Sequence, residues 1–179
     1  MPAAPVDDGG ASHLVPGTPL PDIALPSSLG GEINLRDLHA AVVYVYPWTG
    51  RAGLADPPGW DDIVGAHGST PETEGFRDHY AGFQALGVEV LGISAQDTGH
   101  QAELSARLGL PFAILSDKDF HLQRALRLPT FMAGGEPFLK RLTLVVSKGS
   151  IARTFYPVHP PETHAGQVLK WLFGLSQKL

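Results

Sequence analysis

The 179-residue sequence contains no cysteine. This absence excludes disulfide bonds, zinc–thiolate sites and thiol catalysis in the chain as it stands. Two interpretations remain open at this point, because either the protein needs no thiol or its thiols have been replaced. Composition alone does not decide between them.

Positive charge and long hydrophobic runs are also scarce. Thirteen Lys and Arg residues stand against eighteen Asp and Glu residues, a formal net charge of −5, which argues against general nucleic-acid binding because that function needs a basic surface. The longest apolar run, "AAVVYVYPW", is too short to span a bilayer. The start "MPAAPVDDGG" lacks the early basic residue and the apolar stretch of a signal peptide. We therefore expect a soluble cytoplasmic protein with no membrane or nucleic-acid partner.

Several catalytic motifs are missing as well. The sequence has no phosphate-binding or dinucleotide-binding glycine loop, no HExxH metal motif and no G-x-S-x-G nucleophile elbow. His67 lies two residues before Ser69, but no acid partner can be assigned, so a serine-hydrolase role is not favoured. The scattered histidines are interpreted as surface or core-edge residues. No metal and no cofactor are expected.

Hydrophobic residues make up 43% of the chain and charged residues 17%, enough for one well-packed core. Residues 1–13 are rich in Pro, Ala, Gly and Asp, a composition typical of a flexible tail. The remainder, residues 14–179, is expected to form a single domain.

The order of hydrophobic patterns predicts an α/β fold. Runs of β-branched and aromatic residues that contain almost no polar residue predict strands buried on both faces. These runs alternate along the chain with amphipathic stretches, which predict helices. Such alternation requires a parallel sheet with helices on both faces, and a terminal hairpin turning at Lys148-Gly149 makes the sheet mixed. The predicted strands are 40–46, 88–94, 111–117 and the hairpin 140–157. The predicted helices are 70–86, 97–109, 118–128 and 161–175. Asp97 or Thr98 is the expected cap of the second helix and Gly109 its end, and the last helix is expected to bury Val168, Leu169, Leu172 and Phe173.

The stretch "GSTPE" predicts a helix start beside the carboxyl end of the first core strand, where the sites of α/β sheets assemble. Ser69 or Thr70 is the expected cap, Pro71 lies in the first turn, and Glu72 stands where a capping box places an acid. Free N–H groups and the helix dipole stabilise an anion at such a place and lower the pKa of a thiol, but they do little for a serine hydroxyl.

Two further features draw attention. Residues 48–68 form a long loop dense in Gly and Pro, and such loops are usually functional or mobile. Arg141 opens a strand that should be central, where its charge must find an anion or water. A surface position beside Lys140 is an equally open interpretation for this arginine.

These segments together resemble a peroxiredoxin, the thiol-peroxidase branch of the thioredoxin fold, and most of all the Q-type, also called bacterioferritin-comigratory. The resemblance covers about residues 14–172 and rests on the order and spacing of several pieces rather than on any single one. The pieces are "GTPLPDIALPSSLGGEINLRDL", "VVYVYP", "GSTPETEGFRDHYAGFQALGVEVLGIS", "LPFAILSD" and "RLTLVVSKGSIARTFYP".

The resemblance implies a role for four residues. Ser69 takes the place of the peroxidatic cysteine, Arg141 that of the arginine contacting thiolate and peroxide, and Pro47 that of the shielding proline. Ala66 holds the position of the family's active-site threonine, and an insertion separates Pro47 from Ser69. We expect Thr49 to act for that threonine if the loop folds back.

The resemblance also implies partners. They are a peroxide substrate, hydrogen peroxide or an organic hydroperoxide, and a thioredoxin-type or glutaredoxin-type reductant, with a monomer or homodimer as the assembly. Q-type members often carry a resolving cysteine five residues after the first, and that position is Glu74 here. Two alternatives stay open: a resolving cysteine on another helix, for which Ser105 is the candidate position, or an external thiol.

Serine at position 69 has a severe chemical consequence. It cannot form the sulfenic acid of the thiol-peroxidase cycle, so this chain is expected to be inactive as a peroxidase. Two accounts follow: an engineered Cys→Ser form of an active enzyme, or a natural non-catalytic protein that binds through the 48–68 loop and its Trp48 and Trp60. We favour the first, because "RDHY", Arg141 and Pro47 keep the rest of the site in place.

Overall fold

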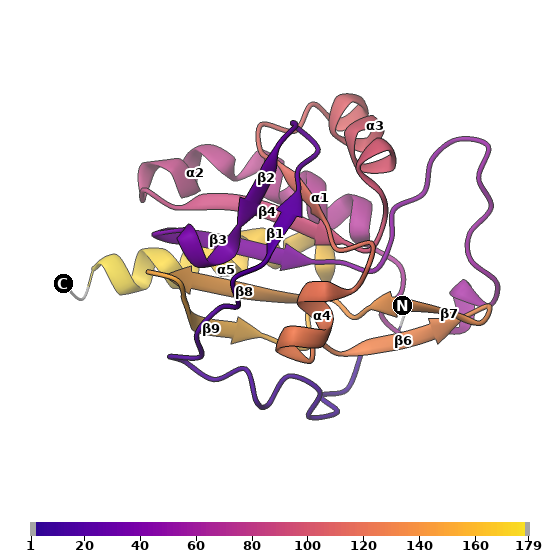
Figure 1. The fold of residues 1–179 in the computed structure, drawn as a ribbon, viewed down its shortest axis with the longest axis horizontal. Coiled ribbons are helices and arrows are strands. Elements are labelled where there is room, and N and C mark those ends of the chain that lie inside the picture. The colour runs from indigo at the N-terminus through magenta and orange to yellow at the C-terminus, as the bar shows by residue number, and fades with distance from the viewer. Residues whose placement is uncertain (1–2, 178–179) are drawn as a thin grey trace.

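A computed structural model describes residues 3–177 and is built around one five-stranded sheet of order β5-β4-β3-β8-β9 (Figure 1). β4 pairs in parallel with both β3 and β5, whereas β8 runs antiparallel to β3 and to β9. The predicted mixed sheet is therefore confirmed. The strands are β3 (Ala40–Val45), β4 (Glu89–Ser94), β5 (Ile114–Ser116), β8 (Leu142–Ser147) and β9 (Ser150–Phe155).

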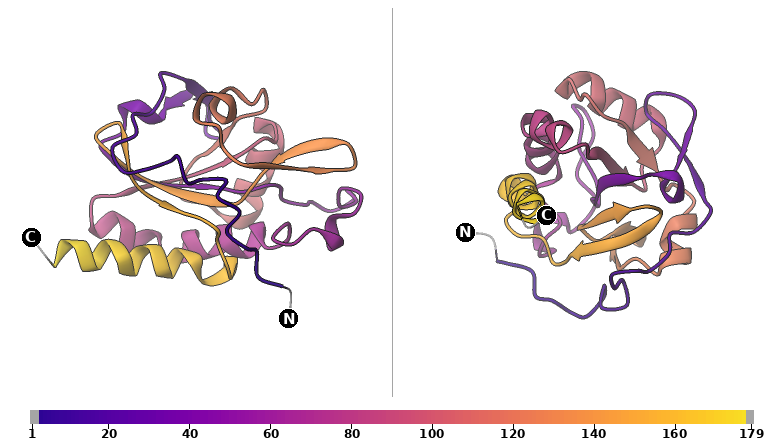
Figure 2. Two further views of the ribbon diagram at one scale, coloured as in Figure 1. Left: turned by 90° about the horizontal axis from the view of Figure 1, so that it is seen from below. Right: turned by 90° about the vertical axis from the view of Figure 1, so that its left-hand side faces the viewer.

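Both faces of the sheet are covered (Figure 2). One face packs against side chains of α1, α2, α3 and α5, and the other against α4 and the small β1–β2 hairpin. This arrangement is the predicted α/β, thioredoxin-like architecture. The elements are α1 (Ser69–Asp78), α2 (Tyr80–Ala85), α3 (Thr98–Leu108), α4 (His121–Leu126), α5 (Pro161–Ser176), β1 (Ala24–Pro26) and β2 (Glu32–Asn34), with single 3-10 turns at Leu35–Asp37 and Trp60–Asp62.

Strand β3 contributes side chains to the hydrophobic clusters on both faces of the sheet, which is why its sequence contains almost no polar residue. Val43 and Val45 belong to the cluster on one face, whereas Val42 and Tyr44 belong to the cluster on the other. The ring of Tyr44 stacks on Phe76 of α1 with centroids 4.4 Å apart. Removing a fully buried aromatic side chain costs about 3–5 kcal/mol, so this stack fixes α1, and with it the helix start, against the sheet.

Two local predictions are confirmed in detail. The Asp97 side chain accepts a hydrogen bond from the His100 backbone N–H and caps α3, and Gly109 ends the helix with a φ of 62°. The β8–β9 turn places Lys148 and Gly149 at φ values of 50° and 76°, the backbone that a tight hairpin with right-handed strand twist requires.

Other boundaries differ from the prediction. The helix expected over 70–86 is interrupted at His79, whose ring Nδ1 lies 2.8 Å from the Gly75 carbonyl oxygen. Phe173, expected in the buried face of α5, is 56% exposed, because the last turns of α5 extend beyond the sheet (Figure 2). A hairpin of β6 (Thr130–Ala133) and β7 (Glu136–Leu139) was not predicted at all.

The N-terminal segment also differs from the expected flexible tail. Among residues 3–13, Asp8 accepts hydrogen bonds from the Lys140 ammonium (2.7 Å) and the Tyr156 hydroxyl (2.6 Å), and Ala11 is buried in the core. These contacts hold the segment against the sheet domain; residues 1–2 lie outside the described part. Within residues 3–177, no helix combines the length and the apolar character needed to cross a bilayer.

Candidate active site

Ser69 lies at the first position of α1 and is only 3% exposed. The N-cap is Gly68, not Ser69 or Thr70, and it makes no side-chain cap bond. Gly68 has a φ of 110°, and an added Cβ would lie 2.4 Å from Pro161 Cγ. Backbone conformation and packing therefore both require glycine, which leaves the Ser69 hydroxyl free for a long-range contact.

Arg141 makes that contact. It directly precedes β8, is 6% exposed, and donates from Nη2 to the Ser69 hydroxyl oxygen at 3.2 Å. The same Nη2 lies 3.2–3.4 Å from the carbonyl oxygens of Gly65, Ala66 and His67. The interpretation of Arg141 as a surface residue is wrong, because this guanidinium ties the end of the 48–68 loop to the start of α1.

Glu72 completes the buried core of the site and is the residue that sequence reasoning misread. Its carboxylate does not close a capping box; Oε1 accepts from Arg141 Nη1 at 3.0 Å, and the side chain is fully buried. Burial raises the pKa of the Glu72 carboxyl, and the adjacent guanidinium opposes that rise. The available sequence signal was spacing, since Glu72 and Phe76 lie four residues apart and so share the inward face of α1.

Two polar atoms of this ion pair keep unused hydrogen-bonding capacity. Arg141 Nε and Glu72 Oε2 are buried and have no partner among the described residues. Buried polar atoms are normally paired with protein, water or ligand. The pair therefore has capacity for further polar contacts at this site.

The structure brings only some of the predicted residues together. Pro47 is buried immediately beyond the end of β3. Thr49 is also buried, but its hydroxyl bonds to Gln96 Oε1 (3.2 Å) and its carbonyl oxygen lies 2.8 Å from His100 Nε2. Among residues 3–177 Thr49 makes no hydrogen bond to Ser69, so the expected return of Thr49 to the helix start is not observed; it anchors the beginning of the loop to α3 instead.

The aromatic residues of the 48–68 loop point inward. Trp60 is 3% exposed and packs against Trp48, Phe131 and Phe138, with ring centroids 5.0–5.7 Å apart. This aromatic cluster attaches the loop to the β6–β7 hairpin. The buried Trp60 and the half-buried Trp48 therefore pack within this cluster and do not form the exposed adhesive surface considered for them.

The positions considered for a second cysteine lie on two helices. Glu74 on α1 is partly exposed and pairs with Arg77 at 3.6 Å, and Ser105 on α3 is 8% exposed. Neither contributes to the Ser69–Arg141–Glu72 group.

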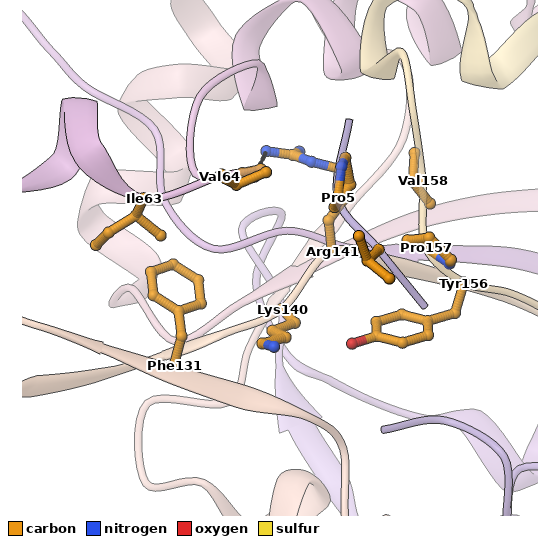
Figure 3. Close-up of a pocket in the computed structure, with 11 residues that line it drawn as sticks. Pro5, Ile63, Val64, Phe131, Lys140, Arg141, Tyr156, Pro157 and Val158 are labelled. Carbon is orange, nitrogen blue, oxygen red and sulfur yellow. Dashed lines mark hydrogen bonds between the residues drawn. The ribbon is translucent and has the colours of Figure 1, made fainter. Parts of the chain in front are cut away.

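Two hollows reach Arg141. The smaller, of about 140 Å³, is lined largely by apolar side chains such as Ile63, Val64, Phe131 and Val158 (Figure 3). The larger, of about 560 Å³, also includes Gly68, the neighbour of Ser69. The smaller hollow thus places Arg141 beside an apolar stretch of wall, which suits a ligand with a polar head and an apolar body. The lining of the larger hollow also includes the acidic residues Asp61, Asp62 and Glu162.

Of the histidines interpreted as surface or core-edge residues, His164 is buried instead, whereas His67 lies on the surface as expected. His164 is 2% exposed, bonds to the Thr143 hydroxyl at 2.8 Å, and has its pKa lowered to about 4, by burial first and by Arg141 second. On the surface, His67 groups with Asp56 and Asp61, with candidate ligand atoms within 4.8 Å of one another. Exposed clusters of this kind are common without a metal.

Comparison with known proteins agrees with this geometry. The AhpC/TSA family matches residues 65–154. A putative chloroplastic peroxiredoxin Q of Oryza sativa subsp. indica is 30% identical over 162 residues, which cover 89% of this chain and 67% of the relative. The chloroplastic peroxiredoxin Q of Arabidopsis thaliana is 28% identical over 87% of this chain and 66% of its own length.

Solved structures show the same fold. The bacterioferritin comigratory protein of Xanthomonas campestris, studied for alkyl peroxide reduction, superposes with a TM-score of 0.71 at 25% identity, covering 90% of this chain and 99% of that one. A cysteine-to-serine mutant of Xylella fastidiosa PrxQ gives a TM-score of 0.74 at 22% identity, covering 92% and 98%. The chain belongs to the AhpC/TSA family and is a Q-type peroxiredoxin without cysteine.

Proposed function

We propose that Ser69 occupies the place of the peroxidatic cysteine, and that the cysteine-bearing form of this protein is a thiol-dependent peroxidase. The observation that carries the proposal is the 3.2 Å contact from Arg141 Nη2 to the Ser69 hydroxyl, at the buried first turn of α1. A sulfur atom at this position would lie beside a fixed positive charge and the positive end of a helix. Both favour the thiolate over the thiol.

The chemistry of that form follows from these groups. The thiolate attacks the terminal peroxide oxygen, an S–O bond forms as the O–O bond breaks, and the other oxygen departs as alkoxide or hydroxide and takes up a proton. Arg141 stabilises the negative charge that moves onto the leaving oxygen. The sulfenic acid product is returned to thiol by two thiol groups of a thioredoxin-type or glutaredoxin-type reductant, which leave as a disulfide together with water.

The chain as it stands retains the binding part of this site but not the redox step. A serine hydroxyl stays protonated at neutral pH and cannot be oxidised to the equivalent of a sulfenic acid. Arg141 and the helix start still offer donors to a peroxide oxygen. The apolar side chains that line the smaller hollow beside Arg141 support organic hydroperoxides as substrates alongside hydrogen peroxide.

The decisive experiment restores the sulfur. In the Ser69→Cys variant, peroxide-dependent oxidation of dithiothreitol or thioredoxin should appear, and adding Arg141→Ala should reduce the rate by about 10²-fold or more, the usual loss when a transition-state donor is removed. Ser105→Cys is the matched control, since it puts one thiol on α3, away from Arg141. An inert Ser69→Cys variant with every thiol donor, or equal activity from Ser105→Cys, would overturn the proposal.

The origin of the serine is a separate matter and stays a prediction. We favour a Cys→Ser replacement in an active parent, and the encoding gene decides between that account and a natural binding protein. Cytoplasmic location likewise stays a prediction.

A further inference from the structure

We propose that residues 3–8 form one wall of the substrate pocket, and that Val6 on this wall selects hydroperoxides that carry an apolar substituent. The inference rests on the proposed function, because it concerns the same pocket. Pro5 lines the smaller hollow together with Arg141 (Figure 3). Val6 lines the same hollow, and Ala3 lines the larger one. The segment therefore contributes to both hollows that reach the guanidinium.

The wall is held by a specific latch. The Asp8 carboxylate bonds to Lys140 Nζ at 2.7 Å and to the Tyr156 hydroxyl at 2.6 Å, and Lys140 is the residue directly before Arg141. Hydrogen bonds from Lys140 and then from Tyr156 hold the pKa of Asp8 far below its ordinary value. A Cβ at Gly10 would lie 2.9 Å from Asp8 Oδ1, so the backbone is also closely fitted at this point.

The wall also touches the loop that Arg141 holds. Pro5 packs beside Gly65, where an added Cβ would lie 3.6 Å from Pro5 Cβ. The Gly65 carbonyl oxygen is one of the acceptors of Arg141 Nη2, at 3.4 Å. A direct chain of contacts thus joins the N-terminal segment to the buried arginine.

Two exposed apolar side chains indicate what the wall is for. Val6 is 84% exposed and Val64 is 56% exposed, and both line the smaller hollow. Large apolar side chains that remain exposed around one pocket suit the covering of an apolar ligand surface. The hydroperoxide head lies at Arg141, so the substituent is placed along Val6 and Val64, whereas hydrogen peroxide has no substituent to reach them.

The test uses the absence of cysteine, because the thiol introduced by Ser69→Cys is then the only one in the chain. The alkylation rate of this thiol is measured with iodoacetamide and with N-benzyl iodoacetamide, which is the same electrophile carrying an apolar substituent. This measurement needs no peroxidase activity. Cumene hydroperoxide and hydrogen peroxide form the second pair of probes. In both pairs the measured quantity is the ratio of the large to the small reagent's rate.

Val6→Asn should lower both ratios about fourfold to tenfold, since burial of one methylene-sized group corresponds to about fourfold in rate. Because Val6 is largely exposed, this variant should fold normally. Leu29→Asn is its control, at an apolar residue of the β1–β2 turn that is also largely exposed, at 66%. Asp8→Asn should lower the ratios in the same direction by opening the latch, whereas Asp22→Asn, outside the wall, whose carboxylate accepts from the Asn34 side-chain amide, should not.

The outcomes separate the two proposals. Altered alkylation ratios without any peroxide turnover would support the wall and contradict the peroxidase function. Normal turnover with ratios unchanged by both Val6→Asn and Asp8→Asn would overturn the wall and leave the peroxidase function standing. Equal effects of Leu29→Asn and Val6→Asn would also overturn the wall.

Discussion

One guanidinium serves two residues of the same helix turn: Arg141 donates to the Ser69 hydroxyl at 3.2 Å and to the Glu72 carboxylate at 3.0 Å. Glu72 neutralises the buried arginine and orients it, while Nη2 faces the position where chemistry would occur. A buried charge pair of this kind is weak evidence for stability but fixes geometry well. The proposed site is therefore pre-organised even though position 69 carries a hydroxyl instead of a thiol.

Removing the negative partner tests this arrangement. Glu72→Gln should destabilise the protein by about 1–3 kcal/mol, since it leaves the arginine without a counter-charge but keeps an acceptor oxygen. Urea unfolding measures the loss. Glu74→Gln, two residues along the same helix and partly exposed, should change stability by less than about 0.5 kcal/mol. Equal losses from the two variants would contradict the role assigned to Glu72.

The cap of α1 offers a second test. Gly68→Ala must adopt a φ of 110° and places its Cβ against Pro161, whereas Gly87→Ala has a φ of 71° and open space around it. Both pay a backbone strain of about 1–2 kcal/mol, and the first adds the steric overlap. Thermal unfolding should therefore show a clearly larger loss for Gly68→Ala. A loss of stability no greater than that of Gly87→Ala would mean that Pro161 moves aside with no measurable free-energy cost, and would contradict this account of Gly68.

Much of this fold was predictable because the signal lies in short segments. The buried strand at residues 40–45, the cap and end of α3, and the Lys148-Gly149 turn each follow from local residue type. The position of Ser69 at a helix start followed from "GSTPE" in the same way. Such features depend on neighbours within a few residues, which the sequence displays directly.

The rest depends on long-range partners that spacing does not reveal. Glu72 fits a capping box locally, but a guanidinium 69 residues away offers the buried carboxylate a charged partner. Thr49 bonds to residues 47 and 51 positions later, and Asp8 bonds to a lysine 132 positions later. The N-terminal residues have the composition of a flexible tail, but the Asp8 carboxylate, the Tyr156 hydroxyl and the burial of Ala11 hold them against the domain.

Acid should reveal the buried histidine. The pKa of His164 is lowered to about 4 in the folded protein from an ordinary value of 6.5, so between these values the unfolded chain binds the extra proton. The contribution of neutral His164 to the free energy of unfolding is complete above pH 6.5. It is lost as the pH falls toward 4, and the total loss is about 3 kcal/mol. His164→Gln should flatten the fall of Tm over this window, whereas the exposed His39→Gln should not; parallel curves for all three proteins would contradict the assignment.

The aromatic cluster gives the last test, because it decides what the 48–68 loop is for. Trp60→Ala removes a side chain that is 3% exposed and touches three other aromatic rings, so it should cost about 3–5 kcal/mol. Leu54→Ala in the same loop, at a residue that is 54% exposed, should cost less than about 0.5 kcal/mol.

The end of this loop supplies three carbonyl oxygens to Arg141. Trp60→Ala combined with Ser69→Cys should therefore also lower the peroxidase rate. Chemical unfolding and reductant oxidation measure the two effects. If Trp60→Ala leaves stability unchanged, the loop is not attached through this residue, and an adhesive role for its tryptophans regains support.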